Sequence, residues 1–169
     1  VKRLFRAVND AFPAVPGAEI SLEVDPRVTS AAHIDALREC GFNRISLGIQ
    51  DSPEALVQKA GAALAEGYRK VKIKIKPGKD VAFVRAVREA YPDAPLMVDA
   101  NNAFTLDDTS ALEAMDDLGL MMFEQPLDWE DIVRHAELQR RLRTPICLDE
   151  SITSLARAQD MVTLGAGRI

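Results

Sequence analysis

The chain has 169 residues, of which 47% are hydrophobic and 28% are charged, and its formal net charge is −5. This balance is typical of a globular protein with one sizeable core, and it excludes wholesale disorder. The negative charge argues against a general nucleic-acid binder, which usually carries a basic face. No apolar run is long enough to span a membrane and no signal-peptide pattern opens the chain, so we expect a cytoplasmic protein with neither nucleic-acid nor membrane partners.

Helical and strand-like patterns alternate from one end of the sequence to the other. Apolar residues at helical spacing predict helices over 1–12, 31–40, 53–66, 81–90, 106–119, 129–143 and 154–165. Short β-rich runs predict strands over 18–25, 44–51, 71–76, 95–100, 120–126 and 145–150. Residues 167–169 look like the opening of another strand. Ser52, Thr105 and Asp108 stand where helix-capping residues are expected.

The alternation predicts parallel strands joined by right-handed crossover helices. The units repeat at roughly 25 residues, the length of one βα unit in a (β/α)8 barrel. We therefore expect an α/β fold, a partial TIM-like (β/α) barrel of about six parallel strands with its helices outside. A doubly wound open sheet is the alternative, but no Gly-rich phosphate loop follows the first strand. Because an open barrel exposes strand edges, we expect a homo-oligomer.

The segment VKIKIKPG, residues 71–78, alternates lysines with β-branched residues. In a parallel sheet covered by helices, the β-branched side chains would face the helices. Lys72 and Lys74 would then face the barrel interior or its rim, where a buried ammonium group is costly unless a partner needs it. Lys76 precedes a Pro-Gly turn and can reach solvent.

Three carboxylates end successive predicted strands, since Asp99, Glu124 and Asp149 follow one another at intervals of 25 residues. Neighbouring strands lie about 4.8 Å apart, so the three groups should converge. A hard divalent cation, usually Mg²⁺, relieves their mutual repulsion. For any one of them, a helix-capping role is the alternative. With Lys72 and Lys74 one strand earlier, the set indicates a metal-assisted site that removes a proton next to the carboxylate of a small-molecule substrate.

The two cysteines, Cys40 and Cys147, stand alone, without the spacing of a metal-binding motif. A disulfide framework or a structural zinc site therefore has no support.

Four segments within residues 44–169 resemble the enolase superfamily: GYRKVKIKIKPGKD, LMVDANNAF, MMFEQPLDWED and TPICLDESITS. The most similar group is that of o-succinylbenzoate synthase and N-acylamino acid racemase. The resemblance implies Mg²⁺ ligands at Asp99, Glu124 and Asp149, acid/base chemistry at Lys74 with Lys72 beside it, and supporting positions near the metal at Asn101 and Glu150.

Residues 1–51 instead resemble the radical S-adenosylmethionine barrel of oxygen-independent coproporphyrinogen III oxidase, through the segment AEISLEVDPRVTSAAHIDALRECGFNRISLGIQD. By this resemblance Glu23 and Gln50 match residues that contact S-adenosylmethionine. The cluster-binding C-x-x-x-C-x-x-C motif is absent, so we expect no iron–sulfur cluster and no radical chemistry. We interpret the chain as a single partial barrel, 1–169, in which segments 1–51 and 52–169 form a chimera joined within residues 44–51.

The sequence starts inside a helical pattern and stops where a strand begins, which suggests a piece of a larger protein. By the enolase resemblance, the second acid/base lysine, the last strands and the capping domain would lie outside it. We therefore expect a truncated Mg²⁺-dependent site for proton abstraction alpha to a carboxylate, of lyase or racemase ancestry, with weak or absent native activity. The alternative is an engineered chimeric scaffold without catalytic activity.

Overall fold

The computed structural model describes residues 2–24, 29–47, 52–78 and 80–168. The strands are β1 (Ser21–Val24), β2 (Arg44–Leu47), β3 (Lys70–Lys74), β4 (Leu96–Asp99), β5 (Phe123–Glu124) and β6 (Ile146–Cys147). The helices are α1 (Lys2–Ala11), α2 (Ala31–Glu39), α3 (Pro53–Ala65), α4 (Asp80–Ala90), the 3-10 turn η1 (Leu106–Asp108), α5 (Thr109–Asp116), α6 (Ile132–Arg141) and α7 (Leu155–Leu164). Among the described helices, none combines the length and the apolar character that a membrane span requires.

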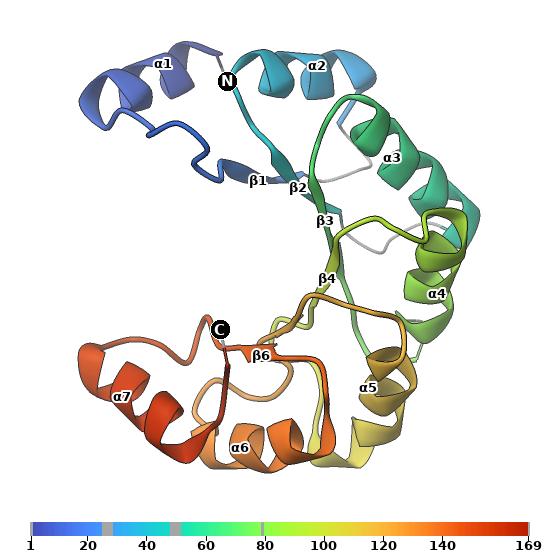
Figure 1. Ribbon diagram of the computed structural model, residues 1–169, viewed down its shortest axis with the longest axis vertical. Helices are drawn as coiled ribbons and strands as arrows, with labels where there is room; N and C mark the ends of the chain where they lie inside the picture. Colours follow the sequence, from blue (N-terminus) through green and yellow to red (C-terminus); the bar gives the residue numbers. More distant parts are fainter. Residues whose placement is uncertain (1, 25–28, 48–51, 79, 169) are drawn as a thin grey trace.

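The strands form one parallel sheet of six in the order β1-β2-β3-β4-β5-β6, so each pairs with its neighbours in sequence. Figure 1 shows the helices as an outer arc with the strands along its inner side, which is the arrangement of an incomplete (β/α) barrel. The predicted parallel α/β fold is confirmed. At the far edge of β6, the backbone amide of Arg168 donates to the carbonyl of Ile146 at 2.9 Å, where the sequence predicts a further strand to open.

Two predicted capping residues begin helices as expected. The hydroxyl of Ser52 accepts a hydrogen bond from the Ala55 amide at 3.3 Å, which satisfies one donor in the first turn of α3. The amide of Thr105 donates to Asp108 at 2.8 Å, and this pair forms the predicted capping box before η1 and α5.

Strands β5 and β6 are two residues long and therefore shorter than the predicted runs 120–126 and 145–150. The backbone of Gln125 has φ of 39°, which ends the extended conformation directly after Glu124. After β6, the amide of Asp149 donates to the side chain of Gln125 at 2.9 Å instead of to a neighbouring strand. The residues that follow both strands therefore belong to loops at the carboxyl edge of the sheet.

The core lies between the sheet and the helices that cover it. Val71 and Ile73 are fully buried, and Lys72 between them is only 5% exposed, so β3 is covered on both faces. Lys76, beyond the end of the strand, is exposed as predicted. The side chain of Lys72 therefore lies in the interior of the partial barrel, where its charge needs partners.

The two helices at the ends of the arc, α1 and α7, have no buried residues. Phe5 of α1 packs on Phe42 with ring centroids 4.9 Å apart, whereas Leu4 and Phe12 are 71% and 79% exposed. In α7, Leu155 is 77% exposed. The apolar face predicted for the first helix is thus present but largely uncovered, near the outer edge of the sheet at β1.

We expect the chain to self-associate through these uncovered end helices and the strand edge beside them, because apolar surface and unpaired strand edges favour association. Light scattering over a wide concentration range should show dimers or larger species. The double variant Phe12→Asp and Leu155→Asp should weaken the association. A strictly monomeric native chain would contradict this expectation.

Candidate active site

The ammonium group of Lys72 lies between two carboxylates on the two following strands. Its Nζ atom is 2.9 Å from Oδ2 of Asp99 and 3.0 Å from Oε1 of Glu124. All three side chains are buried: Lys72 is 5%, Asp99 1% and Glu124 7% exposed. The sheet places them there, because Asp99 and Glu124 are register partners at the ends of β4 and β5.

Burial and charge act against each other in this cluster. Burial alone would lower the pKa of Lys72, but hydrogen bonds and attraction from Asp99 and Glu124 outweigh it and hold that pKa above its ordinary value. The pKa of Glu124 is raised, mainly by burial and also by the nearby negative charge of Asp99, against the lowering effect of Lys72. One ammonium group is therefore shared between two buried carboxylates.

Asp149 stands in a different register from Asp99 and Glu124, and the prediction that the three carboxylates converge stays a prediction. Glu124 pairs with Cys147, the last residue of β6, so Asp149 lies two residues beyond the level of Asp99 and Glu124. The physical reason is the stagger that a barrel needs in order to close, which shifts the register at some strand pairs but not at others.

The described residues other than glycine that have positive φ gather at this edge: Asn101 (41°), Asn102 (63°) and Gln125 (39°). Such conformations are rarely adopted without a compensating constraint, and they cluster at functional sites. The amide of Asn101 donates to Oδ1 of Asp99 at 3.1 Å, and its side chain donates to Glu150 at 3.3 Å. The structure thus brings together Asn101 and Glu150, and their supporting role near a metal stays a prediction.

Three further residues are predicted for the site: Lys74, Glu23 and Gln50. Lys74 is half-buried at the end of β3 and is the register partner of Asp99. Glu23 belongs to β1, and nothing is described of its side chain; Gln50 lies outside the described residues.

Two polar residues at this edge were not singled out from the sequence, although both have clear positions. Gln125 is fully buried and hydrogen-bonds the loop after β6. The signal that points to it is a glutamine directly after a strand-end carboxylate, in a stretch that is otherwise apolar.

His135 is the second of these residues and is fully buried in α6. Its Nε2 accepts a hydrogen bond from the amide of Leu127 at 3.1 Å, so Nδ1 carries the proton and donates to the carbonyl of Asp131 at 2.8 Å. The neutral form of His135 thereby fixes the loop between β5 and α6.

The side chains at this edge are of the chemical type that binds a hard divalent cation. They offer carboxylate oxygens, and Oε2 of Glu150 is buried with no hydrogen-bond partner in the described structure, so a cation or its water would satisfy that oxygen. Across the described residues, however, no three acidic, histidine or cysteine side chains converge as a ready metal site. The assignment of Asp99, Glu124 and Asp149 as ligands stays a prediction.

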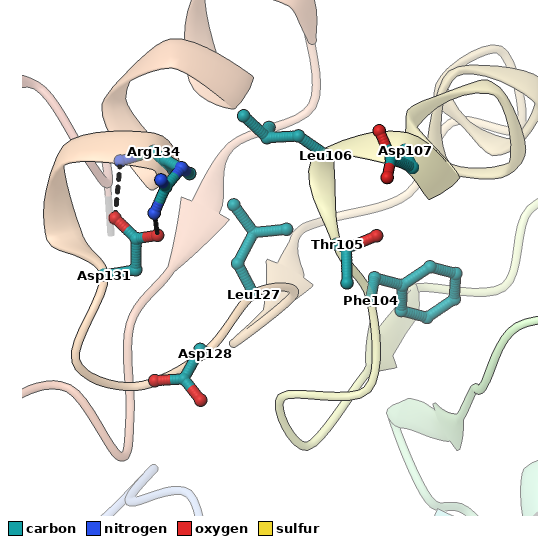
Figure 2. A pocket seen from close by; sticks show the side chains of 8 residues that line it. All are labelled: Phe104, Thr105, Leu106, Asp107, Leu127, Asp128, Asp131 and Arg134. Atoms are coloured by element: carbon teal, nitrogen blue, oxygen red, sulfur yellow. Dashed lines mark hydrogen bonds and ion pairs between the residues drawn. The ribbon is translucent and has the colours of Figure 1, made fainter.

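A separate pocket of about 340 Å³ opens between the loops that follow β4 and β5. Figure 2 shows the apolar side chains of Leu106 and Leu127 facing each other across it, with the ion pair of Asp131 and Arg134 at one side. None of the predicted site residues lines this pocket. It lies beside the loop that His135 fixes.

The fold and its charged side chains define a class: a (β/α) barrel whose polar residues stand at the carboxyl ends of successive strands. Residues 55–169 match the family described as Enolase C-terminal domain-like. The chain belongs to this family.

Several relatives carry the same stretch. The chain is 54% identical over 125 residues to an o-succinylbenzoate synthase of Geobacillus kaustophilus, which covers 74% of this chain and 33% of that protein. It is 50% identical over 125 residues to an N-succinylamino acid racemase of Thermus thermophilus, covering 74% and 34% respectively. The solved structure of a probable mandelate racemase from Alicyclobacillus acidocaldarius superposes with a TM-score of 0.72 at 42% identity, over 74% of this chain and 33% of that one.

The chain therefore spans about a third of the length of these relatives. The family match begins at residue 55, after β1 and β2. The resemblance of residues 1–51 to a radical S-adenosylmethionine barrel, and the chimera with its junction at 44–51, stay predictions.

Replacing Lys72 by methionine should lower the free energy of unfolding by about 3–5 kcal/mol, because two buried carboxylates lose the cation that they share. Urea denaturation measures this loss. The matched control is Lys76→Met on the exposed end of the same segment, where a change within about 0.5 kcal/mol is expected. Equal effects of the two substitutions would contradict the proposed burial of the ion cluster.

Stability should fall in mild acid because of His135. Burial lowers the pKa of His135, more than the hydrogen bond and charge of Asp131 raise it, so the folded state takes up a proton less readily than the unfolded state. The contribution of neutral His135 is complete above a pH of about 6.5 and is lost as the pH falls below it, by at most about 1.4 kcal/mol per pH unit. Comparing unfolding of the native chain and His135→Gln at several pH values isolates this effect, and parallel pH profiles would disprove it.

Proposed function

We propose that the carboxyl edge of β3 to β6 is a Mg²⁺-dependent site for proton abstraction alpha to a carboxylate, of the o-succinylbenzoate synthase and N-succinylamino acid racemase type. The observation that carries this proposal is the buried Lys72 between Asp99 and Glu124, with Lys74 in register beside Asp99. The names of the relatives at 54% and 50% identity support the substrate class, an N-succinyl amino acid or a related succinyl carboxylate.

The cation would be held by Asp99, Glu124 and Asp149. When bound, it would supply positive charge to the substrate carboxylate as the neighbouring carbon loses its proton. The carboxylate oxygens at this edge are the ligands that a hard divalent cation prefers. Asn101 and Glu150, which hydrogen-bond each other, would hold the loops behind the ligands.

Lys74 would accept the alpha proton. The carbon–hydrogen bond breaks, its electron pair enters the bond to the carboxyl carbon as an enediolate forms, and the proton becomes bound to the lysine nitrogen. The reverse transfer returns a proton to the same carbon. Lys72 lies two residues before Lys74 on β3 and already neutralises part of the charge of Asp99 and Glu124. It would contribute a fixed positive charge beside the reacting group.

Because both lysines come from β3, we expect proton exchange from one face of the substrate. Turnover should be slow, since the chain spans about a third of the relatives' length and water exclusion by further segments contributes strongly to such reactions.

The test is deuterium incorporation into an N-succinyl amino acid in heavy water with Mg²⁺, followed by proton NMR. The native chain should exchange the alpha proton with retention of configuration, and exchange should require the metal. Lys74→Ala should abolish it, whereas Lys76→Ala, two residues further along and exposed, should leave it unchanged. No exchange above the metal-only rate, or equal exchange in Lys74→Ala, would overturn the proposal.

A further inference from the structure

Gln125 is the residue after Glu124, and its side chain is bonded at both ends although it is fully buried. Its Oε1 accepts hydrogen bonds from the amides of Asp149 at 2.9 Å and Ser151 at 3.2 Å. Its Nε2 donates to Oγ of Ser151 at 2.8 Å and to the carbonyl of Leu127 at 3.2 Å. One side chain therefore satisfies groups in the loop after β6 and in its own loop.

The backbone of Gln125 adds two further connections. Its amide donates to the carbonyl of Cys147 at 2.9 Å, and its carbonyl accepts from the amide of Asn102 at 3.0 Å. Its φ of 39° is rare for a residue that is not glycine. A single residue in an unusual conformation thus joins the loops that follow β4, β5 and β6.

The position of Asp149 depends on these contacts more than on the sheet. The ladder between β5 and β6 ends at Cys147, so the Asp149 amide has no strand partner and uses Gln125 instead. Asp99 and Glu124 differ in this respect, because they are themselves ladder residues.

We propose that Gln125 is a positioning residue that fixes Asp149 beside Asp99 and Glu124, so that the three carboxylates act as one cation site. This inference rests on the proposed function for the role of the cation, but not for the placement of Asp149. Residues that orient metal ligands typically change metal affinity by 10-fold to 100-fold when they are removed.

The chain contains a matched control in Gln139. This glutamine is 3% exposed, donates from Nε2 to the carbonyls of Leu142 and Thr144 at 3.2 Å each, and accepts from the amide of Ile146 at 2.7 Å. It is therefore comparably buried and bonded, but it acts at the amino end of β6, away from the carboxylates.

The first measurement is amide hydrogen exchange by NMR on Gln125→Ala, Gln139→Ala and the native chain, and it needs no metal. In Gln125→Ala, the amides of Asp149 and Ser151 should lose protection while Ile146 keeps it. In Gln139→Ala the pattern should reverse. Unchanged protection of Asp149 and Ser151 in Gln125→Ala would overturn the proposal whether or not the chain binds a cation.

The second measurement is Mn²⁺ titration, followed by the paramagnetic resonance signal of the free ion and expressed per folded molecule. Gln125→Ala should weaken Mn²⁺ binding by about 10-fold to 100-fold, and Gln139→Ala should leave it unchanged. Equal weakening by both variants would show a general loss of stability and would overturn the positioning role. Absence of Mn²⁺ binding in the native chain would overturn the proposed function. The hydrogen-exchange measurement would then still test whether Gln125 positions Asp149.

If Gln125→Ala does not fold, Gln125→Met replaces it in both measurements. Methionine fills a similar volume, but its thioether has no donor and is only a weak acceptor. Asp149 and Ser151 should again lose protection while Ile146 keeps it, and unchanged protection of Asp149 and Ser151 would contradict the proposal.

Discussion

The buried ammonium group of Lys72, which Asp99 and Glu124 share, constrains the order and register of the strands around it. Charges with so little contact with water are tolerated only when opposite charges meet them at hydrogen-bond distance. That requirement is met here only if β3, β4 and β5 are parallel neighbours in this register, with Lys72 pointing away from the helices. The cluster therefore links the order of the strands to the chemistry at their ends.

Much of this arrangement could be predicted from local sequence patterns. The alternation of helical and strand-like periods indicates a parallel sheet, and the order of the six strands agrees with it. The alternating lysines of β3 become informative only in that context, because a covered sheet gives Lys72 an interior position and leaves Lys76 in solvent. These features depend on short-range periodicity, which the sequence displays directly.

Other features depend on contacts between distant residues and could not be predicted in the same way. The level of Asp149 is set by the stagger between β5 and β6, which equal spacing along the chain does not reveal. The role of Gln125 depends on groups 24 and 26 residues away. Burial of His135 depends on how α6 packs over the loop at Leu127, and its sequence position in a polar helix gives no sign of it.

The change of register between β5 and β6 also affects which ions a site formed by Asp99, Glu124 and Asp149 would prefer. Two of its carboxylates are attached to the sheet, whose spacing is nearly invariant, and the third is carried by a loop. A cation would meet a rigid pair on one side and an adjustable ligand on the other. Its selectivity for ionic radius would then be determined by how far the loop at Asp149 can yield, so substitutions in that loop would change ion preference while the sheet stayed the same.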